Sequence, residues 1–250
     1  MTMTHRKLIV ANWKMNGSLS SVREYAAELS NRLETPLDNA QIVIAPPFSY
    51  LMFMEGRLIS SQVGLAAQDC SAKGEKGAFT GDVSAEMLKD IGCQYVIVGH
   101  SERRQHFQET DEMIAAKLKG ALSAGLIPIL CVGETLSERE AGKTKDIVTM
   151  QLTQALKEVS KGTELVIAYE PVWAIGTGKI PTSEDISSLC QSIQSFAQKQ
   201  SIHVTVLYGG SVNSDNAREI LHLPGVDGGL VGGASLTLKT FWPIITAAST

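Results

Sequence analysis

Short apolar runs, rich in β-branched residues, recur along the whole chain, and a longer stretch of mixed character follows each of them. The runs cover residues 8–11, 41–45, 63–67, 95–98, 127–132, 165–169, 204–208 and 228–231. Several contain almost no polar residue, which is typical of parallel strands that are covered on both faces. The pattern therefore predicts eight buried strands.

The stretches between these runs have the spacing of amphipathic helices. The clearest apolar stripe comprises Ile186, Leu189, Cys190, Ile193, Phe196 and Ala197. Ser183 is its expected N-cap. A second stripe comprises Val148, Leu152, Ala155, Leu156 and Val159. Alternation of strands and helices predicts an α/β fold with a parallel sheet, and eight strands favour a closed (β/α)₈ barrel over an open sheet.

The domain organisation is inferred from the length of the chain and from the segments that could divide it. No linker, low-complexity segment or close internal repeat divides the 250 residues. A barrel of this kind commonly occupies about 250 residues as one domain, so length allows this interpretation without requiring it. We expect residues 1–250 to form a single domain.

Composition and charge narrow the possible functions. The net charge of −4 argues against general nucleic-acid binding and against a basic membrane-binding surface. The four cysteines form no CxxC pair, which favours reduced thiols over a disulfide framework or a zinc site. The amino-terminal segment has no signal-peptide core, and no apolar run approaches the roughly 18 residues of a membrane helix. We expect a cytoplasmic protein that contacts neither nucleic acid nor membrane.

Three reactive side chains stand at the ends of predicted strands. Lys14 follows the first strand, His100 the fourth and Glu170 the sixth. Reactive groups of (β/α)₈ barrels gather at the carboxyl ends of the strands, so we expect these three to meet. Each has an ordinary alternative when it is taken alone. The lysine could reach solvent, the histidine could cap a helix, and the glutamate could pair with a lysine or arginine.

The surroundings of His100 suggest a particular ionisation state. Ser101 and Glu102 could open a short helix directly after it. The positive end of such a helix disfavours the imidazolium form. A neutral imidazole could then donate a hydrogen bond to a carbonyl oxygen that is gaining negative charge.

The segment after Glu170 predicts a lid. Apolar residues 172–175 precede a flexible Gly-Thr-Gly sequence, and such a loop could fold over a site and exclude water. The alternative is a hydrophobic surface turn or a contact with a partner. Cys131, at the end of the fifth predicted strand, is best interpreted as a buried packing thiol.

Glycine pairs follow the last two predicted strands. Gly209 and Gly210 precede Ser211, and Gly232 is followed by Gly233. Either pair could be a tight turn and nothing more. Barrel enzymes commonly bind phosphate at this location through backbone amides and a short helix N-terminus, and glycine permits the close approach. Their joint position therefore indicates a phosphate site.

Five segments in order carry a family resemblance. NWKMN, GHSERR, AYEPVWAIGTGK, YGGSV and VGGASL, spread from Asn12 to Ser235, resemble the motifs of the triosephosphate isomerase family. The resemblance implies a TIM barrel that interconverts D-glyceraldehyde 3-phosphate and dihydroxyacetone phosphate through an enediolate, a reaction of glycolysis and gluconeogenesis.

The resemblance also implies roles for individual residues. Glu170 would move a proton between two carbons. A neutral His100 would polarise the two substrate oxygens and shuttle protons between them. Lys14 would supply a fixed cation, Asn12 would donate to the enediolate oxygen, and Glu102 would accompany Lys14. The phosphate would be held by the amides of Gly176, Ser211, Gly232 and Gly233. No metal and no cofactor is implied, and the sequence has no HExxH or cysteine-rich ligand set.

The segment from Gln68 to Gly81 resembles the family's protruding interface loop. The resemblance implies a homodimer in which a threonine at the position of Thr80 reaches towards the partner's site. Composition alone would favour the alternative, a solvated loop rich in glycine and lysine.

One departure from the family pattern lies at Ile180-Pro181, where a small flexible pair is expected. Proline fixes φ near −65° and restricts the residue before it, so we predict altered lid kinetics with preserved chemistry. Two other functions stay open. Another phosphate-binding barrel enzyme would lack the combined motifs, and a non-catalytic barrel would be expected to lose Lys14, His100 or Glu170.

Overall fold

The computed structural model describes residues 6–35, 37–58, 63–74, 76–177 and 179–249. Within them, eight parallel strands close into a barrel in chain order, with β1 pairing with both β2 and β8. The strands are β1 (Lys7–Asn12), β2 (Ala40–Ala45), β3 (Val63–Ala67), β4 (Tyr95–Val98), β5 (Ile127–Val132), β6 (Glu164–Tyr169), β7 (His203–Tyr208) and β8 (Gly228–Val231). Every predicted run lies inside one of them. The predicted (β/α)₈ barrel is confirmed.

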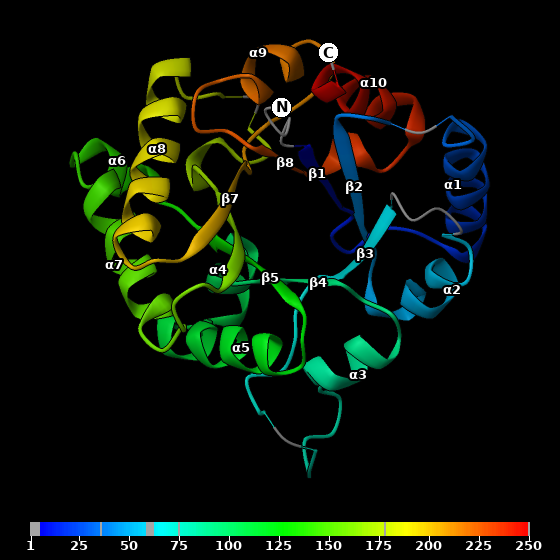
Figure 1. Cartoon of the computed structure of the whole chain (residues 1–250), viewed down its shortest axis with the longest axis horizontal. Coiled ribbons are helices and arrows are strands. Elements are labelled where there is room, and N and C mark those ends of the chain that lie inside the picture. The colour runs from blue at the N-terminus through cyan, green and yellow to red at the C-terminus, as the bar shows by residue number, and fades with distance from the viewer. Residues whose placement is uncertain (1–5, 36, 59–62, 75, 178, 250) are drawn as a thin grey trace.

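Helices surround the barrel on its outside (Figure 1). The α-helices are α1 (Leu19–Arg32), α2 (Leu51–Glu55), α3 (Ala85–Asp90), α4 (Ser101–Phe107), α5 (Asp111–Ser123), α6 (Leu136–Glu140), α7 (Thr144–Leu156), α8 (Ser183–Lys199), α9 (Ala217–Leu221) and α10 (Leu238–Ser249). Three single 3₁₀ turns accompany them: η1 (Phe48–Tyr50), η2 (Val172–Ala174) and η3 (Gly233–Ser235).

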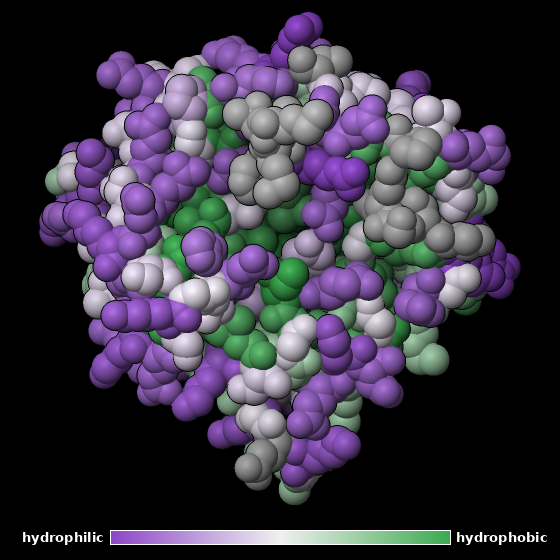
Figure 2. Space-filling view, viewed as in Figure 1, coloured by the Kyte–Doolittle hydropathy of each residue, from purple (hydrophilic) through white to green (hydrophobic). Residues whose placement is uncertain are grey.

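The strands bury both of their faces, which explains their continuous apolar character. Alternate strand residues, such as Val10, Val43 and Ile97, form one cluster that fills the barrel. Their neighbours, such as Ile9 and Ile42, belong to a second cluster that also contains the inner faces of the helices. Polar side chains cover most of the rim in Figure 2, and hydrophobic side chains show in its recessed middle.

The N-cap of α8 differs from the prediction. Thr182, not Ser183, caps this helix, and its hydroxyl accepts a hydrogen bond from the Asp185 amide at 3.1 Å. Ser183 is the first helical residue, and its hydroxyl donates to Glu219 at 2.5 Å. Both residue types can cap a helix, and the competing tertiary contact decides between them. The stripe of α7 also ends earlier than expected, because the helix stops at Leu156.

The segment between β3 and α3 extends away from the barrel (Figure 1). It contains the predicted interface loop from Gln68 to Gly81, of which residue 75 lies outside the described residues. The hydroxyl of Ser71 donates to Asp82 at 2.6 Å and joins the two sides of the loop at its base. Phe79 at its tip is 43% exposed.

Candidate active site

One cavity of about 190 Å³ gathers the residues singled out in the sequence. It lies at the carboxyl ends of the strands, where barrel enzymes place their sites. The predicted residues that line it are Asn12, Lys14, His100, Glu170, Gly176, Ser211, Gly232 and Gly233. The structure thus brings all eight together from five strand ends and the lid.

Glu170 is held at the end of β6 by an unusually close backbone contact. A Cβ at Gly133, after β5, would lie 1.7 Å from the Glu170 carbonyl oxygen, so only glycine fits there. The Glu170 side chain is 2% exposed, and both of its oxygens are engaged. One lies 3.0 Å from His100 Nε2, and the other accepts the Ser101 amide at 2.9 Å.

The pKa values of this pair move in opposite directions. Burial of Glu170 opposes its ionisation, but the His100 ring and the Ser101 amide outweigh burial and lower the pKa of the carboxyl. Burial of His100 favours its neutral form, but the Glu170 and Glu102 carboxylates outweigh burial and raise the pKa of the ring. The resting arrangement therefore holds an ionised carboxylate beside a ring that can accept a proton.

His100 is itself the N-cap of α4, and this fixes its ring. The Glu102 amide donates to Nδ1 at 3.2 Å, so Nδ1 carries no proton in this arrangement and Nε2 faces the cavity. Because the helix begins at Ser101, its positive end points at the ring and opposes a second proton. The predicted short helix is present. His100 caps this helix, which was the ordinary alternative for this residue, and it also lines the cavity.

Lys14 adopts a left-handed backbone conformation, with φ of 52°, which is uncommon for a residue other than glycine. Three hydrogen bonds hold this segment. The Lys14 amide donates to Asn12 Oδ1 at 3.0 Å, and Gln68 Nε2 donates to the carbonyl oxygens of Lys14 and Ala45, both at 2.8 Å. The ammonium contacts Glu102 Oε1 at 2.5 Å. The segment thus fixes a cation beside the cavity.

The predicted lid begins with η2 and is attached to its neighbours. Ser211 Oγ donates to the Ala174 carbonyl at 3.0 Å, which links the loop after β7 to the lid. Ile175 and Gly176 line the cavity, and Gly176 has a φ of 70°. Pro181 is buried beyond the lid, whereas Ile180 before it is 42% exposed. Gly178 lies outside the described residues.

A side chain would collide with its surroundings at Gly210, after β7, and would be tightly packed at Gly232, after β8. A Cβ at Gly210 would lie 2.2 Å from the Tyr208 hydroxyl, and one at Gly232 would lie 3.3 Å from Lys14 Cε. Gly232 and Gly233, at the start of η3, both line the cavity. Close backbone approach of this kind suits an anion.

The sequence interpretation missed several contributors. The Ser101 backbone amide binds Glu170, and a contact of this kind cannot be predicted from the type of residue because every residue except proline has a backbone N–H. Gln68 appeared only as the start of a loop. Glu134, with no exposed area, accepts the Trp173 indole N–H at 2.9 Å and lies 3.3 Å from the Tyr169 hydroxyl. A carboxylate two residues after the end of an apolar strand could have indicated Glu134.

Cys131 lies inside the barrel and is fully buried, as the packing interpretation expects. Burial, followed by the nearby Glu170 carboxylate, raises the pKa of its thiol well above the ordinary value. The thiol stays protonated at neutral pH, so a reactive thiolate beside Glu170 is not available.

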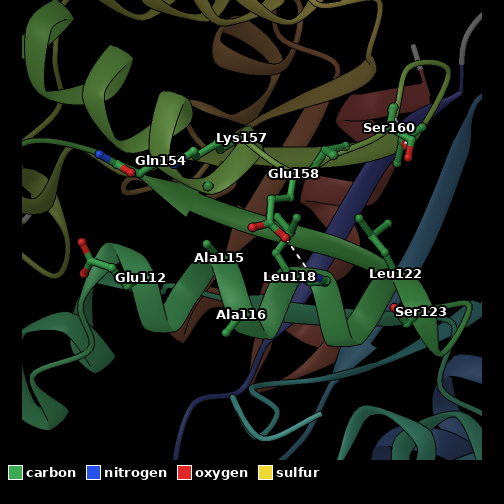
Figure 3. A pocket seen from close by; sticks show the side chains of 14 residues that line it. Glu112, Ala115, Ala116, Leu118, Leu122, Ser123, Gln154, Lys157, Glu158 and Ser160 are labelled. Carbon is green, nitrogen blue, oxygen red and sulfur yellow. Dashed lines mark hydrogen bonds and ion pairs between the residues drawn. The ribbon is translucent and has the colours of Figure 1, made fainter.

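A surface groove of about 630 Å³ lies elsewhere (Figure 3). It runs between α5 and the end of α7, on the outside of the barrel. A bridge from Lys119 to Glu158, 2.7 Å long, crosses it. Both side chains are more than 65% exposed, and such pairs are solvated surface features. Lys14, His100 and Glu170 line the smaller cavity at the strand ends and do not line this groove.

No group of three or more His, Cys, Asp or Glu residues in the described part of the chain is placed to hold a metal ion. None of the helices in the described ranges combines the length and the apolar character that a membrane span requires.

The closed barrel and the position of its cavity place the chain among the (β/α)₈ barrel enzymes. Residues 7–248 match the family model described as triosephosphate isomerase. The chain therefore belongs to the triosephosphate isomerase family, and it is an isomerase.

Curated relatives agree over nearly the full length. The chain is 45% identical over 247 residues to the triosephosphate isomerase of Hahella chejuensis, which covers 97% of this chain and 98% of the relative. It is 46% identical to that of Paracidovorax citrulli, over 99% of this chain and 100% of the relative. It is 47% identical to that of Delftia acidovorans, over 97% of this chain and 99% of the relative.

Proposed function

We propose that the chain interconverts D-glyceraldehyde 3-phosphate and dihydroxyacetone phosphate, a step of glycolysis and gluconeogenesis, with Glu170 as the base. The observation that carries the assignment of roles is the position of a buried, ionised Glu170 between His100 and the Ser101 amide at the wall of the cavity. Cytoplasmic location and a single domain belong to the same proposal.

Glu170 acts after its carboxylate is released from its resting partners. Both oxygens are occupied by His100 and Ser101, so substrate has to displace these contacts before the carboxylate can reach a carbon. Glu170 then takes a proton from one carbon, the bonding electrons pass to the carbonyl oxygen, and an enediolate forms. The same carboxylic acid returns the proton to the neighbouring carbon, while His100 gives a proton to the new oxyanion and takes the proton of the adjacent hydroxyl, which becomes the carbonyl of the product.

His100 and Lys14 stabilise the charge that develops on the oxygens. Once Glu170 has turned away, the main influence that raises the pKa of His100 is gone. Burial and the N-terminus of α4 remain, and both favour the neutral ring. Nε2 donates to the oxygens, the Lys14 ammonium supplies a positive charge, and the Asn12 side-chain amide is a further donor. The predicted neutral histidine therefore describes the substrate complex.

The phosphate is held by backbone amides at two strand ends and the lid. The donors are the amides of Gly176, Ser211, Gly232 and Gly233. An enediolate phosphate can expel its phosphate group when water has access, so the closed lid protects the intermediate. Local dipoles and Lys14 attract the dianion against a net charge of −4.

A coupled assay tests the reaction. Pure protein is mixed with D-glyceraldehyde 3-phosphate and an excess of metal chelator, and formation of dihydroxyacetone phosphate is followed. We expect full turnover under these conditions. Absence of isomerisation would refute the proposed function, and activity that the chelator abolishes would refute the mechanism without a metal.

We also propose that two copies of the chain associate through the loop from Gln68 to Gly81. Support comes from the extension of this loop from the barrel and from large apolar side chains left uncovered in the single chain. Phe79 is 43% exposed, Met87 45% and Met15 95%. Met15 follows Lys14 directly, so a partner that covers it would support the lysine segment.

Light scattering across a dilution series tests the association. We expect the mass of a dimer at micromolar concentration. A charged residue in place of Phe79 should lower that mass, whereas the same change at Met150, which is 48% exposed on α7, should not. A monomer at every concentration would refute the association and leave the proposed reaction standing.

A further inference from the structure

Arg139 joins three elements that meet at the start and the end of the lid. It lies on α6, which belongs neither to the lid nor to the cavity lining. Its guanidinium carbon stands 4.4 Å from the centroid of the Trp173 ring, at the start of the lid. Its Nη2 contacts Asp185 Oδ2 at 2.8 Å, in the first turn of α8, directly after the lid.

The Trp173 ring is thereby held on two sides. Its indole N–H donates to the buried carboxylate of Glu134 at 2.9 Å, and the guanidinium of Arg139 covers its face. Arg139 Nη1 also lies 4.0 Å from the same Glu134 oxygen. An arginine is suited to this position because one planar group can stack on a ring and pair with a carboxylate at its edge.

The helix that carries Arg139 is braced at its beginning. Thr135 and Glu138 form a reciprocal capping box, in which the Thr135 amide donates to Glu138 Oε2 at 2.7 Å and the Glu138 amide donates back at 3.4 Å. This box stabilises a helix of only five residues. The guanidinium therefore has a fixed base, and its side chain is 31% exposed.

We infer that Arg139 is a positioning residue that anchors the lid (residues 172–177 and 179–181) at its start, through Trp173, and at the first turn of the helix that follows it, through Asp185, so that the lid closes between two fixed points. This inference rests on the proposed function, because it assigns a closing motion to the lid. Without the anchor, Trp173 and the first turn of α8 gain freedom that substrate binding has to remove. Ground state and transition state both need the closed lid, so the loss should fall on KM more than on kcat.

The structure offers a matched control for this arrangement. Arg32 also stacks on a tryptophan, 5.2 Å from the centroid of Trp242, and also pairs with a carboxylate, Glu28, at 2.9 Å. It lies on α1, apart from the lid and from the cavity lining. A variant without Arg32 therefore shows the effect of losing a stacked and paired guanidinium that does not contact the lid.

The test compares Arg139→Met, Arg139→Lys and Arg32→Met with the unmodified enzyme. For Arg139→Met we expect KM for D-glyceraldehyde 3-phosphate to rise about five- to tenfold, with kcat within about twofold, the size expected for one partly exposed stacked and paired group. The inorganic phosphate released per isomerisation should rise several-fold, because a poorly anchored lid reopens before the enediolate is reprotonated. Arg139→Lys should be intermediate.

A second readout separates positioning from simple destabilisation. Tryptophan fluorescence is titrated with glycerol 3-phosphate, which occupies the phosphate site without reacting. We expect the fluorescence change at saturation to differ in Arg139→Met and to be unchanged in Arg32→Met. If Arg139→Met matches Arg32→Met in KM, in phosphate release and in fluorescence, the inference is wrong while the proposed function stands. An unmodified enzyme without isomerase activity would instead overturn the proposed function.

Discussion

Two groups of largely buried acidic and basic side chains in this molecule differ in their access to the cavity. The first, Glu170 with His100, lines the cavity. The second comprises Asp69, Glu109, Lys117 and Arg103 and does not line it. In the second group Lys117 contacts Asp69 at 2.7 Å and also contacts Glu109, and Arg103 contacts the same two carboxylates at 2.9 and 2.5 Å. Two acids and two bases balance each other.

The difference shows how burial can serve either stability or chemistry. In the second group strong cationic partners hold the carboxylates, and burial raises the pKa of Asp69 even though Lys117 opposes the shift. In the first group a titratable ring and a backbone amide hold the carboxylate, and a ligand in the cavity can displace both. Accessibility of the partners, more than burial itself, distinguishes the two groups.

The largest expected effect comes from opening the second group. Lys117→Met leaves two buried carboxylates short of a partner, so the free energy of unfolding should fall by about 3–5 kcal/mol in urea denaturation. Turnover per folded enzyme should change little. Lys119→Met removes the exposed pair with Glu158 and should leave the free energy of unfolding nearly unchanged. Equal costs for the two variants would contradict the comparison.

The first group should respond in catalysis instead. Glu170→Asp keeps the charge but withdraws the carboxylate by one methylene, so kcat should fall about 100-fold, measured in the coupled assay. The melting temperature should move little. Glu164→Asp makes the same change at the exposed start of β6 and should leave kcat unaltered. An intact kcat in Glu170→Asp would show that Glu170 is not the base.

The pair of Glu170 and His100 should also give stability a pH dependence. The pKa of His100 is raised above its ordinary value of 6.5, so the contribution of the protonated ring is complete below pH 6.5 and is lost as pH rises through the folded-state pKa. The free energy of unfolding lost in His100→Gln should therefore be larger at pH 6 than at pH 9. In a Glu170→Gln background this dependence should become smaller, because only Glu102 then raises the pKa of His100, and an undiminished dependence would assign it elsewhere.

The smallest effect is expected at the end of the lid. Pro181→Ala relaxes φ at this residue and frees Ile180, so the exchange rate of the lid should change while kcat stays within about twofold. Relaxation dispersion on the lid amides measures the rate, and the coupled assay measures turnover. Unchanged exchange in the variant would remove the predicted influence of this proline.

Much of the fold was predictable because strands that are buried on both faces are continuously apolar in sequence. The ranges 63–67, 95–98 and 127–132 coincide with β3, β4 and β5. Errors arose where two residues compete for one role, as Thr182 and Ser183 do at the start of α8. Local sequence does not contain the contact with Glu219 that engages Ser183.

The candidate site was predictable to the extent that its chemistry resides in side chains. Lys14, His100 and Glu170 could be chosen by residue type and by their place after a strand. Two other contacts could not be predicted in this way. The Ser101 backbone amide binds Glu170, and the Gln68 side-chain amide binds the carbonyl of the left-handed Lys14. Each contact involves a backbone group and joins residues that are far apart in sequence.

The sequence by itself determined the eight strands, the order of the motifs and the family of the chain, since these depend on local pattern and residue identity. Tertiary structure alone decided which partner each buried group obtains. Closure of the barrel brings residues 69 positions apart, Ser101 and Glu170, within 2.9 Å, and it sets Arg139 against both ends of the lid. Such contacts depend on the geometry of strand ends in space, which no local stretch of sequence encodes.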